Sequence, residues 1–341
     1  MATIRDVARL AGTSVSAVSA ALNHNNRHNI RVGHTTRARI HAAAAELGYS
    51  ANPIARSLAT GRTGVLGLVF PYSGAFTDRN PFCIEVMSGV FDEVVRRKVH
   101  VMLYTGASDT WNAGDESSAI DPRVDGLLLV LPSPDSPAVD RALREGVPCV
   151  AVVYEPSSPD LICVNADDEK GGLLATRHLI SLGHRRIAHL AGQPQVATSA
   201  PRTRGYFNAL LEAGIPRDDD LVLTAGFTEG DGIRGMKRLL ELPATKRPTA
   251  VFACNDLCAR GALNASQAAG LSVPDDMAIV GFDDTWFAPL LQPSLTTVRM
   301  PTYEMAVLAT RMLIDLVNGK EPEEKQPVLP VSLSIRESTV R

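Results

Sequence analysis

The 341-residue sequence lacks several features that would place it in a special class of protein. It has no run of about 18 apolar residues, so no segment is expected to cross a membrane. Its first residues, MATIRDVARLAG, lack the long apolar stretch of a secretory signal peptide. The cysteines are odd in number and scattered through apolar runs, at 83, 149, 163, 254 and 258. This usage argues against a disulfide framework and favours a reducing cytoplasm.

Sequence motifs of common enzyme classes are absent or weak. No G-x-S-x-G, H-E-x-x-H or P-loop occurs. Cys254 and Cys258 lack the spacing and the second pair of a zinc site, so they are expected to be buried thiols. Residues 230–235 match G-x-G-x-x-G, with Asp256 downstream, which makes a nucleotide-dependent oxidoreductase the alternative in the enzyme class. Two residues separate the strand from these glycines, and acidic side chains crowd the position that a phosphate would take, so we expect no nucleotide cofactor. With the cysteine spacing and the missing motifs, we also expect no metal and no catalysis.

The composition is that of a globular protein, with 45% hydrophobic and 21% charged residues, and the length suggests two or three folded units. The net charge of −3 averages two unlike parts. Residues 1–60 contain seven Arg, no Lys and two acidic residues, a net of +5, and the rest of the chain carries −8. A small basic head on a large acidic body indicates a polyanion-binding module attached to another domain.

The head has the pattern of three short helices. Apolar residues recur at helical spacing over 4–11, 15–22 and 35–47, and Gly12 makes a tight turn after the first of these segments. Two helices joined by such a turn, with a third packed across them, are typical of a helix-turn-helix unit, whose second helix enters the major groove of DNA. A helical bundle for protein contacts would have the same periodicity, but the charge of +5 favours DNA.

The body has the pattern of two doubly wound parallel-sheet lobes of α/β class. Short buried runs alternate with helical segments, and there are too many runs for one ordinary sheet. The runs are 64–70, 99–104, 125–131, 148–154, 161–166, 185–192, 220–226, 249–255 and 277–283, with a final strand at 331–338. The helical segments are 83–97, 137–145, 168–182, 202–213, 231–241, 256–269 and 302–318. We expect the first lobe at 63–164 plus 295–325 and the second at 165–294 plus 326–341.

Open sheets of this kind bind ligands beyond the carboxyl ends of their strands. The residues that follow the runs are rich in Asp, Asn, Arg and aromatic side chains, and poor in pairs of a nucleophile and a base. Carboxylates, amides and guanidinium groups suit several ligand hydroxyls, and aromatic faces suit a sugar ring or a flat base. The sequence therefore predicts a binding site for a polar small molecule.

Three consecutive blocks, TIRDVARLAGTSVSAVSAALN (3–23), TRARIHAAAAELGY (36–49) and NPIARSLATGRTGVLGLVFP (52–71), resemble the headpiece and hinge of the LacI/GalR family of transcription regulators. Blocks of the body, such as RTRGYFNALLEAG (202–214) and IVGFDDTWFAPLLQPSLTTVRMP (279–301), also resemble that family, so the resemblance covers nearly the whole chain. It implies a headpiece at 1–51, a hinge at 52–62 that becomes helical on DNA, and a body like that of periplasmic binding proteins.

The resemblance implies a set of DNA-contacting residues in the headpiece and hinge: Thr3, Ser14, Val15, Ser16, Ala17, Ser19, Ala20, Asn23, Arg31, Asn52, Ala55 and Leu58. Leu58 would be the minor-groove wedge that kinks the duplex. Ala17 and Ala20 stand where relatives often have Thr and Arg, so the bidentate readout of guanine is lost and the operator sequence stays open. The segment 24–35 is longer than usual, and is either a solvated loop or a source of phosphate contacts.

The resemblance also implies effector contacts, at Asn80, Phe82, Asp167, Arg202, Phe227, Asn255, Asp256, Asp283 and Trp286. Arg202 would be the main anchor and Asp283 an acceptor for ligand hydroxyls, while Trp286 stands at a less typical position. A turn or helix-cap role is the structural alternative for Asp283, Asn255 and Asp256.

The predicted function is a sequence-specific DNA-binding regulator, a repressor, whose affinity for double-stranded operator DNA is controlled by an effector bound between the lobes. A sugar or sugar derivative is the first candidate for the effector, and a nucleobase or nucleoside is the alternative. Whether the effector is an inducer or a co-repressor stays open. We expect a cytoplasmic homodimer or tetramer on a near-palindromic operator. A periplasmic sugar-binding protein would share the body but not the basic head.

Overall fold

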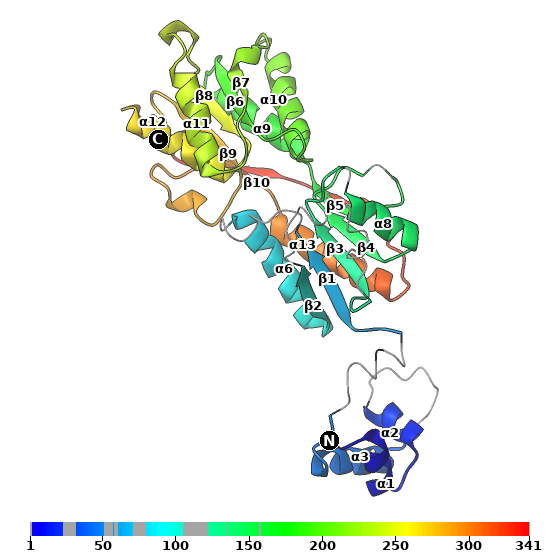
Figure 1. The fold of residues 1–341 in the computed structure, drawn as a ribbon. Helices are drawn as coiled ribbons and strands as arrows, with labels where there is room; N and C mark the ends of the chain where they lie inside the picture. The colour runs from blue at the N-terminus through cyan, green and yellow to red at the C-terminus, as the bar shows by residue number, and fades with distance from the viewer. Residues whose placement is uncertain are drawn as a thin grey trace. The chain divides into compact units, whose positions relative to one another are not determined.

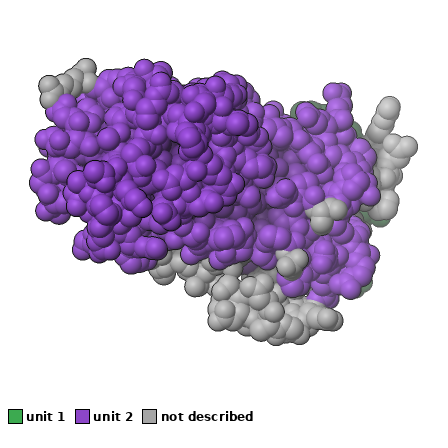
Figure 2. Space-filling view, turned by 90° about the horizontal axis from the view of Figure 1, so that it is seen from above, with its two compact units in different colours: residues 1–64 green, residues 65–341 purple. Residues whose placement is uncertain are grey.

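The computed structural model describes residues 2–22, 32–50, 57, 61–70, 80–104, 122–134, 136–156 and 158–340. The chain forms two compact units, Met1–Gly64 and Val65–Arg341, which Figure 2 colours separately. The small unit is helical and the large unit holds two six-stranded sheets, so the predicted fold class is confirmed. In the described part of the chain, no helix has both the length and the apolar character needed to span a bilayer.

The small unit has the three predicted helices, α1 (Ile4–Leu10), α2 (Val15–Leu22) and α3 (His34–Glu46). A capping box begins α1: the Thr3 side chain accepts from the Asp6 amide, and the Asp6 carboxylate accepts from the Thr3 amide. Gly12 ends it with a left-handed φ of 60°, and the next amide, of Thr13, donates to the carbonyl of Ala8 at 3.0 Å. The apolar faces of the helices then meet in one small core.

The first lobe of the large unit has a parallel sheet with the order β11-β5-β4-β3-β1-β2. Its strands are β1 (Val65–Val69), β2 (His100–Tyr104), β3 (Gly126–Val130), β4 (Cys149–Val152), β5 (Ile162–Ala166) and β11 (Val328–Leu329). The helices that pack on it are α6 (Pro81–Arg97), α8 (Pro137–Glu145) and α13 (Thr302–Val317) (Figure 1).

The second lobe has the sheet order β12-β10-β9-β8-β6-β7, in which only the β10–β12 pair is antiparallel. Its strands are β6 (Ile187–Ala191), β7 (Val222–Thr224), β8 (Ala250–Ala253), β9 (Ala278–Asp283), β10 (Thr296–Arg299) and β12 (Ser332–Ser334). Its α-helices are α9 (Asp168–Ser181), α10 (Ser199–Glu212), α11 (Glu229–Leu240) and α12 (Asp256–Ala268), with 3₁₀ turns at Asp219–Leu221, Ala244–Lys246 and Ala288–Leu290.

The chain crosses between the lobes later than the sequence suggested. The predicted boundary put residues 295–325 in the first lobe, but β10 pairs with β9 in the second sheet, and only α13 lies on the first. Likewise, 326–341 was assigned to the second lobe, but β11 pairs with β5 of the first. The Thr297 hydroxyl explains the first difference, because it donates to the buried Asp256 carboxylate at 2.5 Å and so holds a polar strand in the second sheet.

Two helix pairs cover opposite faces of the second sheet. Along β8, Ala250 and Phe252 belong to the core under α9 and α10, whereas Val251 and Ala253 belong to the core under α11 and α12. This alternation is the pleat of a strand that is buried on both faces. In each pair the helices cross in close contact, so four helical glycines line the two crossings, Gly172, Gly205, Gly232 and Gly261.

Candidate functional site

A cavity of about 800 Å³ lies in the large unit and is lined by residues of both lobes. Its wall is formed mainly at the carboxyl ends of parallel strands and the first turns of the helices that follow them, as expected for open α/β sheets. Six predicted effector residues line it: Asn80, Phe82, Arg202, Phe227, Asn255 and Asp283. The structure therefore brings together residues that are up to 203 positions apart in the sequence.

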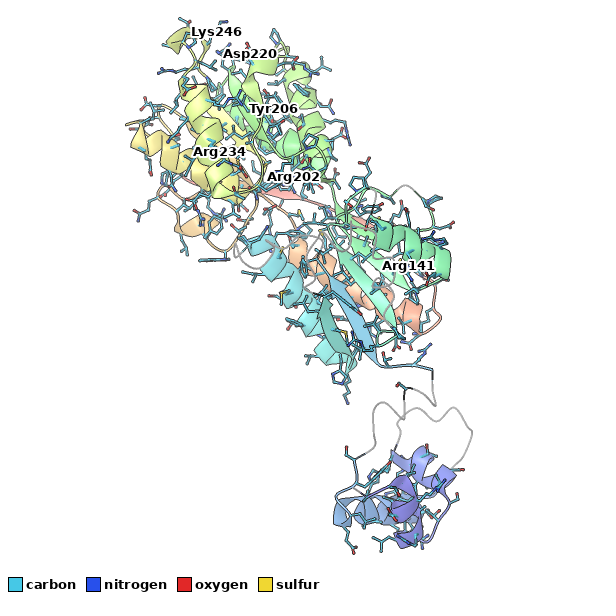
Figure 3. All side chains as sticks on the ribbon, viewed as in Figure 1. Arg141, Arg202, Tyr206, Asp220, Arg234 and Lys246 are labelled. Atoms are coloured by element: carbon cyan, nitrogen blue, oxygen red, sulfur yellow. The ribbon has the colours of Figure 1, made fainter. Side chains whose placement is uncertain are left out.

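Arg202 is the buried cation of the cavity wall. Its side chain is 3% exposed, and its Nε atom donates to Oδ1 of Asp168 at 2.8 Å. Oδ1 of Asp283 is 3.7 Å from Nη1, and the guanidinium stacks on the ring of Phe282, 3.5 Å from its centroid. Nη1 also donates to the carbonyl of Cys254. Two carboxylates therefore share one guanidinium, whose orientation is fixed from several sides. In Figure 3, Arg202 lies at the end of the second lobe nearest the first.

Asp283 is the strained acid of the same wall. It ends β9 with a φ of 113°, and Asp284 follows with a φ of 57°, so two consecutive non-glycine residues have positive φ. Such residues cost about 1–3 kcal/mol each and concentrate at functional sites. Burial raises the pKa of Asp283 well above its usual range, although Arg202 opposes the shift. A carboxyl group of this kind can either accept a hydrogen bond from a ligand hydroxyl or, when protonated, donate one.

The two asparagines of the wall are also helix caps. Oδ1 of Asn80 accepts from the amide of Phe82 at 3.0 Å at the start of α6. Oδ1 of Asn255 accepts from the amide of Cys258 at 2.8 Å, and its Nδ2 donates to the carbonyl of Phe227 at 3.0 Å. For Asn255, the cap role and a place in the cavity wall thus hold together. These bonds fix both side chains before any ligand arrives.

Three predicted effector residues do not line the cavity. Asp167 caps α9 by accepting from the Lys170 amide at 3.0 Å. Asp256 is fully buried, and its carboxylate accepts from Thr285 and Thr297. Trp286 is 70% exposed. Asp167 therefore has a helix-cap role that was not predicted for it. Asp256, for which a cap role was the alternative, is a structural acid that joins α12 to β10.

Other polar residues of the wall were not predicted. They are Ser133 and Ser136 after β3, Gln193, Gln195 and Thr198 after β6, Thr228 at the cap of α11, and Glu229, Asp231 and Arg260 on α11 and α12. The first five stand just after apolar runs, so the same strand-end signal could have found them. Arg260 lies inside a helix, one turn beyond the cap, and no signal in the sequence places it at the cavity.

The G-x-G-x-x-G segment has a packing role in the structure. A Cβ atom on Gly232 would lie 2.0 Å from the carbonyl oxygen of Cys258, and one on Gly235 would lie 2.8 Å from Leu190. These glycines therefore let α11 approach α12 and β6. All five cysteines are buried and free, as predicted, and the described ranges contain no cluster of His, Cys, Asp and Glu that could hold a metal ion.

The predicted DNA-contacting residues of the small unit fall into three groups. Thr3 and Ser14 are helix caps, since the Ser14 hydroxyl accepts from the Ala17 amide at 3.1 Å. The start of α2 is open: Val15 is 41% exposed, Ser16 is exposed, and Ala17 and Ser19 are half-buried. Ala20 is only 9% exposed, which leaves its methyl group little surface for a thymine. The remaining five lie outside the described residues: Asn23, Arg31, Asn52, Ala55 and Leu58.

Comparisons with known proteins agree along the whole chain. Residues 3–52 match bacterial regulatory proteins of the lacI family, and residues 176–339 match the periplasmic binding protein-like domain. The transcriptional regulator CelR of Thermobifida fusca is 34% identical over 338 residues, 98% of each chain. The repressor PurR of Photobacterium profundum is 30% identical over 340 residues, 99% of this chain and 98% of the relative.

Solved structures give the same result. A complex of CelR with cellobiose is similar with a TM-score of 0.76 and 33% identity, over 99% of this chain and 100% of that one. The lac repressor dimer bound to operator and the anti-inducer ONPF is similar with a TM-score of 0.84 and 25% identity, over 100% and 99% of the two chains.

Proposed function

Because this chain belongs to the LacI family of bacterial regulatory proteins and is a DNA-binding transcription regulator, we propose that its effector is a neutral sugar or sugar derivative. The charge balance of the cavity wall carries the proposal. Among the described lining residues, the cations Arg202 and Arg260 face three acids, Asp283, Glu229 and Asp231. This wall has no surplus positive charge for a phosphate or carboxylate, whereas paired acids, cations and amides suit ligand hydroxyls.

The relatives support a sugar and keep the nucleobase as a second candidate. The CelR complex contains cellobiose, so a similar body accommodates a neutral sugar. A nucleobase is favoured by one observation, that the rings of Phe82 and Phe227 both line the cavity. Trp286, the third aromatic residue among the predicted effector contacts, is 70% exposed and does not line the cavity. The sugar therefore stays the first choice.

The cavity is assigned to binding rather than to catalysis. Its acids are held by other groups of the protein: Asp283 lies beside the guanidinium of Arg202, Asp231 accepts from the Thr228 amide, and Glu229 accepts from Arg260. The described lining residues include no cysteine and no histidine. Effector binding would favour one arrangement of the lobes. This change in the arrangement of the lobes would be transmitted to the hinge at 52–62, which is proposed to become helical on operator DNA. The affinity for the operator would change as a result.

We infer that the regulator works as a homodimer on a near-palindromic operator in the cytoplasm. An exposed apolar face on α6 supports the dimer: Ile84, Phe91 and Val95 share one side of the helix and are 45%, 42% and 75% exposed. Trp286 and Leu290 are two further exposed apolar side chains, at 70% and 67%. Sedimentation at micromolar concentration should give a dimer, and Val95→Asp should shift it toward the monomer; a wild-type monomer would contradict this.

The effector proposal is tested by calorimetric titration of the full-length protein with sugars, nucleobases and nucleosides. A sugar should bind, and Arg202→Ala should lose binding by at least about 10-fold, because a charged hydrogen-bond donor is removed. Folding is checked by circular dichroism. Tight binding of a nucleobase with no sugar bound would select the second candidate.

The DNA half of the proposal is tested separately, with an operator selected from random duplexes. Leu58→Ala should weaken binding to that operator several-fold and leave effector affinity unchanged, because the wedge that kinks the duplex is lost. If the Leu58→Ala variant binds the operator as tightly as the wild type does, Leu58 is not the wedge that kinks the duplex.

A further inference from the structure

The two helix pairs of the second lobe contain the same polar triad. In α9 and α10, Glu169 accepts from Nε of Arg204 at 3.0 Å and from Nδ2 of Asn208 at 2.9 Å. In α11 and α12, Glu229 accepts from Nη2 of Arg260 at 2.5 Å and from Nδ2 of Asn264 at 2.8 Å. In both pairs a glycine follows the Glu by three positions and another follows the Arg directly. The triads therefore belong to equivalent helix crossings.

Only one of the two triads reaches the cavity. Arg260 and Glu229 both line it, whereas Arg204 and Glu169 do not, and the latter pair is 53% and 43% exposed. Arg260 also lies over the ring of Phe287, 4.7 Å from its centroid, which fixes the plane of the guanidinium. The pair α11/α12 thus presents a preorganised ion pair to the ligand space.

Arg260 has donor capacity left after its contacts with the protein. Of its nitrogens, Nη2 bonds to Glu229, and Nε is buried without a partner in the described part of the chain. Nη1 makes no hydrogen bond to a described residue and is not among the buried unsatisfied atoms, so its donors face accessible space. Each oxygen of Glu229 accepts one bond and has a second lone pair for a ligand hydroxyl.

The position of Arg260 separates it from the anchor at Arg202. Arg202 donates to the carbonyl of Cys254, next to the cap of α12, while Arg260 lies five residues beyond that cap at Asn255. Five residues of helix correspond to about 7 Å along the axis. A single sugar ring held by Arg202 and Asp283 would therefore leave Arg260 for another part of the ligand. The cavity volume, about 800 Å³, is near the upper end of the usual range of ~300–1,000 Å³.

We propose that Arg260 and Glu229 form an outer subsite that binds the second ring of a neutral disaccharide or longer oligosaccharide. This inference rests on the proposed sugar effector and specifies its size. The guanidinium donates to a hydroxyl of the outer ring, and the carboxylate accepts from a neighbouring hydroxyl. The outer subsite makes Arg260 a determinant of ligand length, and Arg202 holds the inner ring.

The chain provides its own matched control for this subsite. Arg260→Met and Arg204→Met remove the same guanidinium from the same kind of triad, but only Arg260 lines the cavity. The full-length variants and wild type are titrated by calorimetry with cellobiose, maltose, lactose and sucrose, and with their single rings glucose, galactose and fructose. Thermal unfolding of both variants measures what each triad contributes to stability.

We expect the best disaccharide to lose at least 10-fold in affinity with Arg260→Met, while its single rings change by less than 2-fold. Arg204→Met should leave every affinity unchanged. Equal losses for disaccharide and single ring, or an unchanged disaccharide affinity, would overturn the outer subsite. If only single rings bind the wild type, the subsite is wrong and the sugar effector stands. If no sugar binds, the sugar proposal itself fails, and the inference fails with it.

Discussion

The helix pairs α9/α10 and α11/α12 differ in function although they are built alike. Both pack on the second sheet, cross at paired glycines and tie the crossing with a Glu–Arg–Asn triad. The first pair contributes a buried cation to the cavity, Arg202, while its triad stays on the surface. The second pair presents its triad to the cavity. A local packing motif therefore fixes how helices meet, and the placement of the pair in the fold decides what it can bind.

The strongest test of this equivalence changes the glycines at the two crossings. A Cβ atom on Gly205 would lie 2.0 Å from the carbonyl oxygen of Glu169, and one on Gly261 would lie 2.1 Å from that of Glu229. Gly205→Val and Gly261→Val should each lower the free energy of unfolding by more than the about 1–3 kcal/mol of ordinary overpacking, because backbone must move. Chemical denaturation measures the change.

The control for the crossings is Gly230→Ala, where the nearest atom is the flexible Nη1 of Arg234 at 3.4 Å. This variant should be neutral or slightly stabilised, since alanine favours a helix over glycine by about 1 kcal/mol. If one crossing tolerates valine and the other does not, the two helix pairs are not equivalent.

The next largest effect separates the buried arginine from the partly exposed one. Arg202→Leu leaves Asp168 and Asp283 buried without their cation, so the free energy of unfolding should fall by about 3–5 kcal/mol at neutral pH. Arg260→Leu breaks a pair whose members are 30% and 34% exposed, and should cost about 1 kcal/mol or less. Urea denaturation of both variants checks the ranking, and equal losses would contradict it.

A pH-dependent difference should come from a buried histidine on the α9/α10 face. His189 is buried there, with Nε2 3.1 Å from Oγ1 of Thr203 on α10, and burial lowers its pKa from 6.5 to about 4. Between those values the unfolded chain binds a proton and the folded chain does not, so the histidine's contribution to stability is lost as pH falls from 6.5 to 4. At ~1.4 kcal/mol per pKa unit, the loss is up to about 3 kcal/mol.

The measurement compares His189→Leu with the wild type at pH 7 and pH 4 by urea denaturation. The difference in unfolding free energy between the two proteins should shrink on acidification, because the variant has no proton to bind at this site. A difference that is constant with pH would mean that His189 has the same pKa in the folded and unfolded protein.

The smallest expected effect concerns the asparagines of the two triads. Asn208→Ala and Asn264→Ala each remove one hydrogen bond to a glutamate, which is worth about 1 kcal/mol or less at a solvent-exposed site. The losses in thermal unfolding should match, but only Asn264→Ala should weaken binding of a disaccharide, and by less than Arg260→Met. An equal effect of Asn208→Ala on binding would contradict the comparison.

Most of the fold could be predicted because its strands are apolar and buried on both faces. Runs such as 125–131 and 249–255 differ from β3 and β8 by only one or two residues at each end. No strand was predicted at β10, because its sequence TTVR is polar and hydropathy cannot detect it. Thr296 and Thr297 are nevertheless fully buried, with their hydroxyls bonded to Arg336 and Asp256.

The candidate site was predictable where it follows strand ends. Asn255 and Asp283 stand directly at the ends of apolar runs, and both line the cavity. Trp286 follows the same run by a few residues and is exposed, because the chain turns after two residues with positive φ. The approach of α11 to α12 brings Arg260 to Glu229, and that approach depends on glycines whose neighbours are remote in the sequence.

The sequence by itself determined the order and type of most elements, the separation of a basic head from an acidic body, and the strand ends at which a ligand would bind. Those properties depend on local periodicity and composition. Only the tertiary structure decided which lobe holds β10 and β11, and which of two identical triads faces the cavity. Hydrogen bonds between buried polar groups and close helix crossings join remote residues, and a local pattern carries no record of such contacts.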